Sequence, residues 1–260
     1  MKTALIQLNT VWESKEKNFE RAEAFVQRAA GEKCDVIVFP ELFSTGFSMN
    51  IASVAEEGYG KTAMTLSQLA RKYGIHLIAG LAMKAPGDAK ARNMAVVYNR
   101  KGLPNATYTK IHPFSYAGEQ DYYEAGTRTV VFELDGMPSS VFICYDLRFP
   151  EAFRNVAREV QAIFVIANWA SARKAHWELL LQARAIENQC FVIGVNRTGA
   201  DGNGIEYPGA SRIFGPSGDL VCAGNETDEY VTGEFNPGEV KEVRARFPFL
   251  NDMHLFDYLS

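Results

Sequence analysis

The sequence contains no apolar run that approaches the ~20 residues needed to span a bilayer. At the N-terminus, Gln7 and Asn9 interrupt the apolar residues before the core of a signal peptide is formed, so this segment indicates a first strand. Basic residues are outnumbered by acidic ones, 27 against 31, and the net charge of −4 offers nucleic acid no overall attraction. We therefore expect a cytoplasmic protein with no membrane partner and no nucleic-acid partner.

Cysteine and histidine are scarce, at four residues each. No two cysteines have the close spacing of a zinc knuckle or a redox dithiol, and a reducing compartment disfavours disulfides. The histidines are likewise not paired at metal-ligand spacing, so we expect no catalytic metal. The default role of a free cysteine is a small buried hydrophobe, and we expect that role for Cys34, Cys190 and Cys222.

The motifs of several common catalytic and nucleotide sites are also absent. There is no G-x-x-x-x-G-K-[ST], no G-x-S-x-G and no H-E-x-x-H. Gly202-Asn203-Gly204 lacks the third glycine of a dinucleotide-binding loop, and His176-Trp177-Glu178 lacks the P-C-x-x-C partner found in zinc deaminases. We expect no cofactor.

The 260 residues are 47 % hydrophobic and 22 % charged, which is an ordinary globular composition, and no repeat or linker interrupts them. We therefore expect a single domain over 1–260, in which apolar strands alternate with amphipathic helices. The expected strands are Lys2–Leu8, Asp35–Phe39, His76–Met83, Met94–Asn99, Ala106–Thr109, Thr129–Leu134, Ser139–Cys144, Ala162–Ala167, Cys190–Asn196 and Tyr230–Glu234, and the expected helices are Ser14–Ala30, Thr62–Tyr73, Pro150–Val160 and His176–Asn188.

Turn signals divide the middle and the end of the chain into hairpins. Lys101-Gly102 and Asp135-Gly136 each separate two strand-like runs, and Pro216-Ser217-Gly218 predicts a last hairpin. Antiparallel hairpins combined with strand–helix–strand crossovers indicate an α/β layered fold with two sheets between helices.

A charged or reactive residue stands at the end of three of these strands. Glu41 comes directly after Phe39-Pro40, Lys110 ends the strand Ala106–Thr109, and Cys144 ends the strand that begins at Ser139. In open α/β sheets, ligands collect beyond the carboxyl ends of strands. The three side chains can therefore converge at one site.

The chemistry of these three groups is complementary. A thiolate is a good nucleophile, and an ammonium within ~4 Å favours it by about 4 kcal/mol at an effective dielectric constant of ~20. Lys110 also suits an oxyanion, with the Tyr145 backbone N–H as second donor, and Glu41 suits general base and acid catalysis. Residue types alone leave open a core role for Cys144 and a papain-like pairing of Cys144 with His112.

Three segments around these residues resemble the signature blocks of the nitrilase (carbon–nitrogen hydrolase) superfamily. They are Phe39-Pro40-Glu41, Lys110-Ile111-His112 and Cys144-Tyr145-Asp146-Leu147-Arg148-Phe149-Pro150-Glu151, in the family's order and spacing. The resemblance implies a catalytic triad of Glu41, Lys110 and Cys144, supported by Glu119. It also implies a four-layer α-β-β-α sandwich that a homodimer extends to eight layers, with the C-terminal tail from about 248 packing at the dimer interface.

Within this superfamily the chain is similar to the omega-amidase branch, through residues 39–49, 175–180 and 183–189. The likeness implies hydrolysis of the terminal amide of 2-oxoglutaramate and 2-oxosuccinamate, through a cysteine thioester, to the 2-oxo acid and ammonia. Bacterial members of this kind are associated with methionine salvage. The alternatives are a neighbouring amidase that hydrolyses N-carbamoyl amino acids or aliphatic amides, and a non-catalytic binding member.

A substrate with a carboxylate at its far end needs a cation in the pocket, best a bidentate arginine. Arg173, which follows the strand Ala162–Ala167, is the expected anchor. Arg148 is its competitor, although we expect Arg148 to form a structural ion pair near the site, for instance with Glu119. The remaining expected substrate contacts are the aromatic side chains Phe43, Tyr145 and Trp169.

Overall fold

The computed structural model describes residues 1–254 and contains two large β-sheets and seven α-helices in that range. The first sheet consists of β1 (Lys2–Ile6), β2 (Val36–Val38), β3 (Glu56–Glu57), β4 (His76–Lys84), β5 (Arg92–Tyr98), β6 (Pro104–Thr109) and β15 (Tyr230–Glu234). The second consists of β7 (Phe132–Leu134), β8 (Met137–Ile143), β9 (Ala162–Ala167), β10 (Phe191–Asn196), β13 (Arg212–Phe214) and β14 (Leu220–Ala223). The helices are α1 (Lys15–Gly31), α2 (Ile51–Val54), α3 (Lys61–Tyr73), α4 (Glu119–Tyr122), α5 (Pro150–Val156), α6 (Lys174–Asn188) and α7 (Glu239–Arg246).

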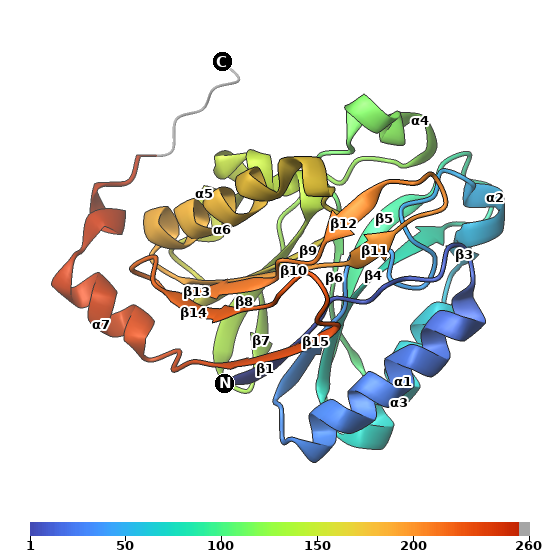
Figure 1. Ribbon diagram of the computed structural model, residues 1–260. Helices are drawn as coiled ribbons and strands as arrows, with labels where there is room; N and C mark the ends of the chain where they lie inside the picture. Colours follow the sequence, from blue (N-terminus) through green and yellow to red (C-terminus); the bar gives the residue numbers. More distant parts are fainter. Residues whose placement is uncertain (255–260) are drawn as a thin grey trace.

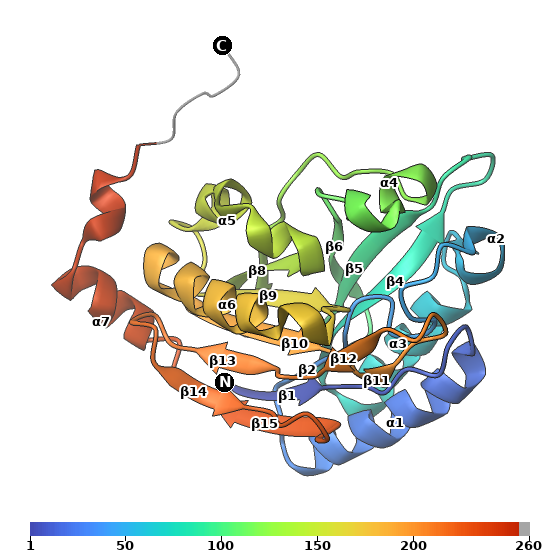
Figure 2. The same ribbon diagram turned by 45° about the horizontal axis from the view of Figure 1, so that its top comes forward.

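The two sheets lie between two layers of helices (Figure 1). The strand order is β15-β1-β2-β4-β5-β6 in the first sheet, where β3 also pairs with β4, and β14-β13-β10-β9-β8-β7 in the second. Helices α1 and α3 cover the outer face of the first sheet, and α5 and α6 cover that of the second (Figure 2). The four-layer α-β-β-α sandwich predicted from the sequence is therefore confirmed.

The first sheet forms around the short apolar strand β2. All three of its residues are fully buried, because β2 pairs in parallel with β1 on one side and with β4 on the other. Helix α1 turns Phe19, Ala22, Val26 and Ala29 toward this sheet. Their helical spacing is the pattern from which the helix was predicted.

The second sheet forms around β9, which is buried along its whole length between the parallel strands β8 and β10. Helix α6 covers it with Trp177 and Leu181, and Gly194 of β10 leaves room for both, since a Cβ there would stand 2.3 Å from Leu181 Cδ1. The inner faces of the two sheets share one core, in which Val38 of the first sheet and Val141 of the second belong to the same cluster.

Strand direction brings the loops that carry the predicted site to one edge. Strand β6 runs in the same direction as β2, because β4 to β5 and β5 to β6 are both antiparallel steps while β2 and β4 are parallel. Strands β8, β9 and β10 are parallel to one another in the second sheet. Residues that follow β2, β6, β8 and β9 therefore gather where the carboxyl ends of both sheets meet.

The three predicted hairpins are present and join β5 to β6, β7 to β8 and β13 to β14. Helix α5 ends at Val156, earlier than its predicted end near Val160. Sequence patterns do not predict the small hairpin of β11 (Thr198–Ala200) and β12 (Glu206–Pro208), whose connection contains Gly202-Asn203-Gly204. That glycine pair forms a hairpin loop and not a dinucleotide loop.

The described part of the C-terminal tail packs against the end of the α5 region. Leu250, in the short helix η4 (Phe249–Asp252), is buried, and Arg158 donates hydrogen bonds to the carbonyl oxygens of Leu250 (3.0 Å) and Met253 (2.9 Å). Residues 255–260 of the tail that we expect at a dimer interface lie outside the described residues. From residue 1 to 254, no helix has both the length and the apolar content needed to cross a membrane.

Candidate active site

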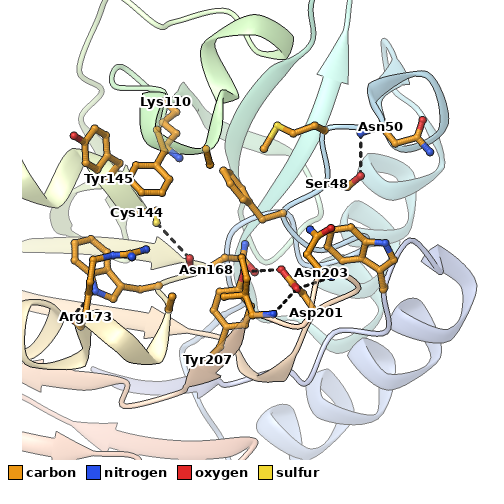
Figure 3. A pocket seen from close by; sticks show the side chains of 18 of the residues that line it. Ser48, Asn50, Lys110, Cys144, Tyr145, Asn168, Arg173, Asp201, Asn203 and Tyr207 are labelled. Carbon is orange, nitrogen blue, oxygen red and sulfur yellow. Dashed lines mark hydrogen bonds between the residues drawn. The ribbon is translucent and has the colours of Figure 1, made fainter.

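The structure brings Glu41, Lys110 and Cys144 together at the shared edge of the two sheets. The Lys110 ammonium lies 2.8 Å from Glu41 Oε1, and both side chains are almost fully buried. Lys110 and Cys144 line one cavity of about 430 Å³ (Figure 3). The side chains that follow β2, β6 and β8 thus meet although 103 residues of chain, 144 minus 41, separate the first from the last.

A second carboxylate completes the set of charges. Glu119, at the start of α4, is fully buried and places Oε2 at 2.8 Å from the Lys110 ammonium. Asn93 of β5 donates to Glu41 Oε1 (2.7 Å) and to Glu119 Oε1 (2.9 Å), so one amide bridges the two carboxylates. One ammonium between two carboxylates leaves the group of three with a net charge of −1.

Asn168 fixes the position of Glu41 from the second sheet. It follows β9 directly, and its backbone N–H donates to Glu41 Oε2 (2.8 Å) while its side-chain amide donates to the Glu41 carbonyl oxygen (2.7 Å). Its own carbonyl oxygen lies 3.8 Å from Cys144 Sγ. Asn168 therefore links the carboxylate of one sheet to the thiol of the other.

Close packing between the backbone of β4 and the backbone at Glu41 holds Glu41 within hydrogen-bond distance of Asn168. Gly80 of β4 lies against the Glu41–Leu42 peptide, and a Cβ at Gly80 would stand 2.6 Å from Glu41 Cα. Leu42 adopts a left-handed conformation with φ of 46°, which turns the chain sharply after Glu41. Any larger residue at position 80 displaces the carboxylate.

The nucleophile sits on a tight turn held by a buried carboxylate. Cys144 begins the 3₁₀ turn Cys144–Arg148 with φ of 47°, a conformation that L-residues rarely adopt. Asp146, fully buried, accepts hydrogen bonds from the Ile143 backbone N–H (3.0 Å) and the Tyr108 hydroxyl (2.7 Å). It also accepts from the His112 backbone N–H (2.9 Å), so it ties the end of β6 to the cysteine turn.

These contacts do not support a papain-like pairing of Cys144 with His112. The His112 ring has Nδ1 at 2.8 Å from Asp146 Oδ1 and stacks on Phe149 at 3.8 Å between ring centroids. No hydrogen bond within residues 1–254 joins His112 to Cys144. The ring therefore helps to hold the turn, and Glu41, whose charge acts on the Cys144 thiol, is the better candidate for the base.

Electrostatics corrects one expectation about the thiol. Burial raises the pKa of Cys144 well above its ordinary value, and the negative charge of Glu41 raises it further, against the opposing effect of Lys110. Lys110 favours the thiolate, as expected, but burial and the carboxylates outweigh it, so the thiol of the free enzyme stays protonated. Burial alone would lower the pKa of Lys110, but Glu119 and Glu41 hold the pKa well above its ordinary value, so Lys110 stays charged.

Both candidate arginines line the cavity, each against an aromatic ring. The Arg148 guanidinium lies 4.8 Å from the Trp169 ring centroid and the Arg173 guanidinium 5.4 Å from that of Phe114. The expected ion pair of Arg148 with Glu119 is absent, because Glu119 is bound to Lys110 and Asn93; Arg148 contacts His176 Nδ1 instead (3.3 Å). Within the described chain, neither guanidinium pairs with a carboxylate.

Of the three aromatic side chains expected at the substrate, two line the cavity and one does not. Tyr145 and Trp169 line the cavity. Phe43 does not, because its backbone N–H donates to Gly80 O (3.0 Å) and its ring packs in the core against Phe39 and Phe19. Phe47, which lies further along the same loop, lines the cavity instead.

The other three cysteines lie outside this cavity. Cys34 and Cys190 are buried in the core, as predicted. Cys222 of β14 is half-buried, with Sγ 3.3 Å from Thr232 O. Among the four, Cys144 is therefore the one that lines this cavity.

Sequence reasoning missed Asn93, Asp146 and Asn168 as functional residues. Asn168 stands directly after β9, at a strand end like the residues that were found, so the same rule points to it. Asp146 lies in the quoted cysteine block without an assigned role. Asn93 has no such signal, because only the tertiary structure brings β5 between the two carboxylates.

Comparison with known proteins agrees with this site and fold. Residues 2–245 match the model of the carbon–nitrogen hydrolase family. The chain is 35 % identical over 251 residues to a 2-oxoglutaramate amidase of Bacillus subtilis strain 168, covering 95 % of each chain, and 34 % identical over 260 residues to the omega-amidase YafV of Escherichia coli K12, covering 98 % of each. It superposes with a TM-score of 0.93 on XC1258 of Xanthomonas campestris, a member of the same superfamily with an arsenic adduct in its active site, at 32 % identity and 98 % coverage of both chains. This chain belongs to the carbon–nitrogen hydrolase family.

Proposed function

We propose that this hydrolase is an omega-amidase, which converts 2-oxoglutaramate and 2-oxosuccinamate to the 2-oxo acid and ammonia. The observation that carries the proposal is the pair of guanidiniums, Arg148 and Arg173, which line the cavity of Cys144 without a carboxylate partner among residues 1–254. Relatives named 2-oxoglutaramate amidase and omega-amidase, each over 95 % or more of its length, support it.

Two arginines select for the 2-oxo acid end of such a substrate. A carboxylate next to a neutral 2-oxo group gains charge-assisted hydrogen bonds from both guanidiniums. Glutamine carries an ammonium in place of the 2-oxo oxygen, and that ammonium is repelled by the same arginines at close range. The site therefore favours the 2-oxo amide over the amino acid that has the same chain.

Acylation begins with a neutral thiol. Cys144 attacks the amide carbon as its proton passes to Glu41, which avoids a free buried thiolate. The oxyanion receives the third N–H of the Lys110 ammonium, whose other two bind Glu41 and Glu119, and the backbone N–H of Tyr145. Glu41 then returns the proton to the amide nitrogen, the C–N bond breaks, and ammonia leaves a thioester on Cys144.

Deacylation uses the same groups in reverse order. Glu41 takes a proton from water, the hydroxide adds to the thioester carbon, and the C–S bond breaks as the proton returns to sulfur. Glu119 keeps the Lys110 ammonium in place throughout and binds no reacting atom in this scheme. The products are the 2-oxo dicarboxylic acid and the resting thiol.

Ammonia release from a panel of substrates tests the proposal. The panel is 2-oxoglutaramate, 2-oxosuccinamate, glutamine, an N-carbamoyl amino acid, an aliphatic amide and a nitrile. We expect kcat/KM to be highest for the two 2-oxo amides, and Cys144→Ala to abolish release while circular dichroism shows an intact fold. Equal rates on glutamine and 2-oxoglutaramate would remove the omega-amidase assignment, and unchanged activity of Cys144→Ala would remove the thioester.

The proposal extends to assembly and location. A homodimer formed through α5 and α6 is supported by the exposed apolar side chains Leu179, Ile186 and Phe249 near those helices, and sedimentation velocity measures it. We place the enzyme in the cytoplasm, where glutamine transamination during methionine salvage supplies its amide.

A further inference from the structure

The cavity continues past the catalytic residues into a compartment that the hydrolysis of a small amide does not use. Six of the residues that line it are Trp12, Glu13, Asn50, Asp201, Asn203 and Ile205. Figure 3 shows Asn50, Asp201 and Asn203 on the side of Cys144 opposite to Arg173 and Tyr145. We call these six residues the distal compartment.

The walls of the distal compartment come from three separate segments. The β11–β12 hairpin supplies Asp201, whose carboxylate accepts the Tyr207 hydroxyl (2.9 Å) and two backbone N–H groups of the hairpin loop. Trp12 fits closely between two glycines, since a Cβ at Gly46 or Gly202 would stand 3.0 Å or 2.5 Å from its indole. Of the Gly202-Asn203-Gly204 segment, Gly202 therefore makes room for this indole.

The charge of the distal compartment is opposite to that of the arginine side. Glu13 and Asp201 line it, and among the described residues no lysine or arginine lines it apart from Lys110 at the catalytic centre. Arg197 lies behind Tyr207, 4.6 Å from the ring centroid, where it balances part of the charge of Asp201. The carboxylate of Glu13 accepts hydrogen bonds from Ser48 and Asn50 and forms no ion pair with a residue between 1 and 254.

The departing nitrogen of the substrate points toward this compartment. The acyl carboxylate lies at the arginines, so the group on the other side of the attacked carbon extends away from them. Glu41, which protonates that nitrogen, begins the same loop that carries Asn50. Asn168 also lines the cavity, is 8 % exposed, and its side-chain oxygen has no hydrogen-bond partner in residues 1–254, so an amide N–H supplies the donor that it lacks.

From this charge separation along one cavity we propose that the distal compartment binds a positively charged substituent on the amide nitrogen. The substrates are N-alkyl omega-amides whose short alkyl chain ends in a fixed positive charge, held by the carboxylate of Glu13. The inference rests on the proposed function and adds a leaving-group subsite to it. The reaction is the same as for ammonia release. The C–N bond breaks, Glu41 gives its proton to the amide nitrogen, and a free amine leaves.

A pair of isosteric substrates tests the subsite by charge alone. Both are 2-oxoglutaramate with an N-ethyl chain, which ends in a trimethylammonium group in one and in a tert-butyl group in the other. A third carries a terminal carboxylate. We expect kcat/KM for the trimethylammonium amide to exceed that for the tert-butyl amide by about tenfold, and the carboxylate amide to be the poorest.

Two variants assign the effect to the compartment. Glu13→Gln removes the negative charge of the distal compartment, and Asn203→Lys adds a cation at the exposed rim of that compartment. Each variant should lower the ratio of kcat/KM for the trimethylammonium amide to kcat/KM for the tert-butyl amide to near one. Glu20→Gln, on the exposed face of α1, is the matched control and keeps the ratio. Asn203→Lys preserves the contacts of Glu13. If Glu13→Gln fails to fold, Asn203→Lys alone tests whether the charge of the compartment causes the substrate preference.

The outcomes separate this proposal from the one on which it rests. Equal rates for the isosteric pair, or no cleavage of either while 2-oxoglutaramate is hydrolysed, overturn the charged subsite and leave the omega-amidase standing. Failure to hydrolyse 2-oxoglutaramate itself overturns the proposed function. A rate preference that both variants leave unchanged overturns the assignment to this compartment.

Discussion

Two charged regions of one cavity are held by the chain in different ways. Glu41, Lys110 and Glu119 are no more than 1 % exposed, and both carboxylates form ion pairs with the one Lys110 ammonium. Arg148 and Arg173 are half-buried, stack on aromatic rings, and have no carboxylate partner within the described chain. The charged groups of the first region therefore find their ion-pair partners when the chain folds, whereas the two arginines find theirs only when an anion binds.

This difference predicts different costs of mutation. Removing one member of a buried ion cluster leaves an uncompensated charge, which typically costs about 3–5 kcal/mol of stability. Removing a half-exposed cation from the cavity wall changes the free energy of unfolding little, because water already solvates it. Substitutions in the first region should therefore affect folding and chemistry together, and those in the second should affect binding alone.

The largest effect is expected for Lys110→Met, which leaves Glu41 and Glu119 buried side by side without a cation. We expect turnover to fall by at least about 10³-fold, through loss of the oxyanion donor, and the free energy of unfolding to fall by about 3–5 kcal/mol. Urea denaturation at two pH values checks the cause. The stability gap to wild type narrows as pH falls, because protonation removes the repulsion between the carboxylates.

Arg148→Met is the matched control for that experiment. It removes a cation of the other region and should change the free energy of unfolding by less than about 1 kcal/mol. A stability loss as large as that of Lys110→Met would erase the distinction between the two regions.

A second prediction concerns the thiol. Because burial and then Glu41 raise the pKa of Cys144, Glu41→Gln should lower that pKa and at the same time reduce turnover by at least about 10²-fold. The rate of alkylation by iodoacetamide, followed against pH, should rise at lower pH in the variant than in wild type.

Labelling of the other cysteines is subtracted with Cys144→Ala, which retains Cys34, Cys190 and Cys222. An alkylation profile that stays in place, or moves to higher pH, would mean that Glu41 does not control the thiol. Slower turnover together with a more reactive thiol would identify Glu41 as the base and not as a mere source of charge.

A third, smaller effect is expected for Asp146→Asn. The substitution replaces one of two acceptor oxygens that hold the Cys144 turn and the end of β6, which costs about 1–3 kcal/mol of stability. We expect kcat to fall by about tenfold with little change in KM, because Asp146 does not line the cavity.

Asp135→Asn separates a positioning role from simple destabilisation. Asp135 also accepts hydrogen bonds, from Arg100, and lies 2.8 Å from His76 Nε2, but it is in the β7–β8 turn and does not line the cavity. It should lose stability and keep kcat. If kcat fell in proportion to the loss of stability in both variants, Asp146 would have a structural role only.

The sequence predicts the two regions unequally well, for physical reasons. The positions of Glu41, Lys110 and Cys144 follow from buried strands, whose apolar runs and turn residues mark their ends. The protonation of the thiol does not follow, because it depends first on burial that only the assembled sheets provide, and then on the negative charges of Glu41 and Glu119. Pairwise reasoning from Lys110 and Cys144 gives the right sign for the effect of Lys110 on the thiol pKa, but it omits the burial that outweighs this effect.

Side-chain direction in loops is the other limit. Phe43 and Phe47 both follow Glu41 at positions typical of a pocket wall, yet the left-handed turn at Leu42 sends Phe43 into the core and leaves Phe47 for the cavity. Loop backbone conformation is set by tertiary contacts such as the hydrogen bond from Phe43 to Gly80. Strand patterns carry no information about it.

The smallest effects on stability are expected for the two arginines, whose role is in substrate binding. Arg173→Met and Arg148→Met should raise KM for 2-oxoglutaramate by about tenfold to a hundredfold each, the value of a charge-assisted hydrogen bond, with little loss of kcat. The effect of Arg173 should be the larger, because its guanidinium makes no hydrogen bond within the described residues, whereas Arg148 is engaged with His176.

An aliphatic amide without a carboxylate is the control substrate, and its KM should not change in either variant. If KM rose equally for both substrates, the arginines would shape the cavity and not read a carboxylate. If Arg148→Met had the larger effect, the carboxylate would lie above Trp169, and the stacked guanidinium would be the anchor because aromatic contact holds it ready for the ligand.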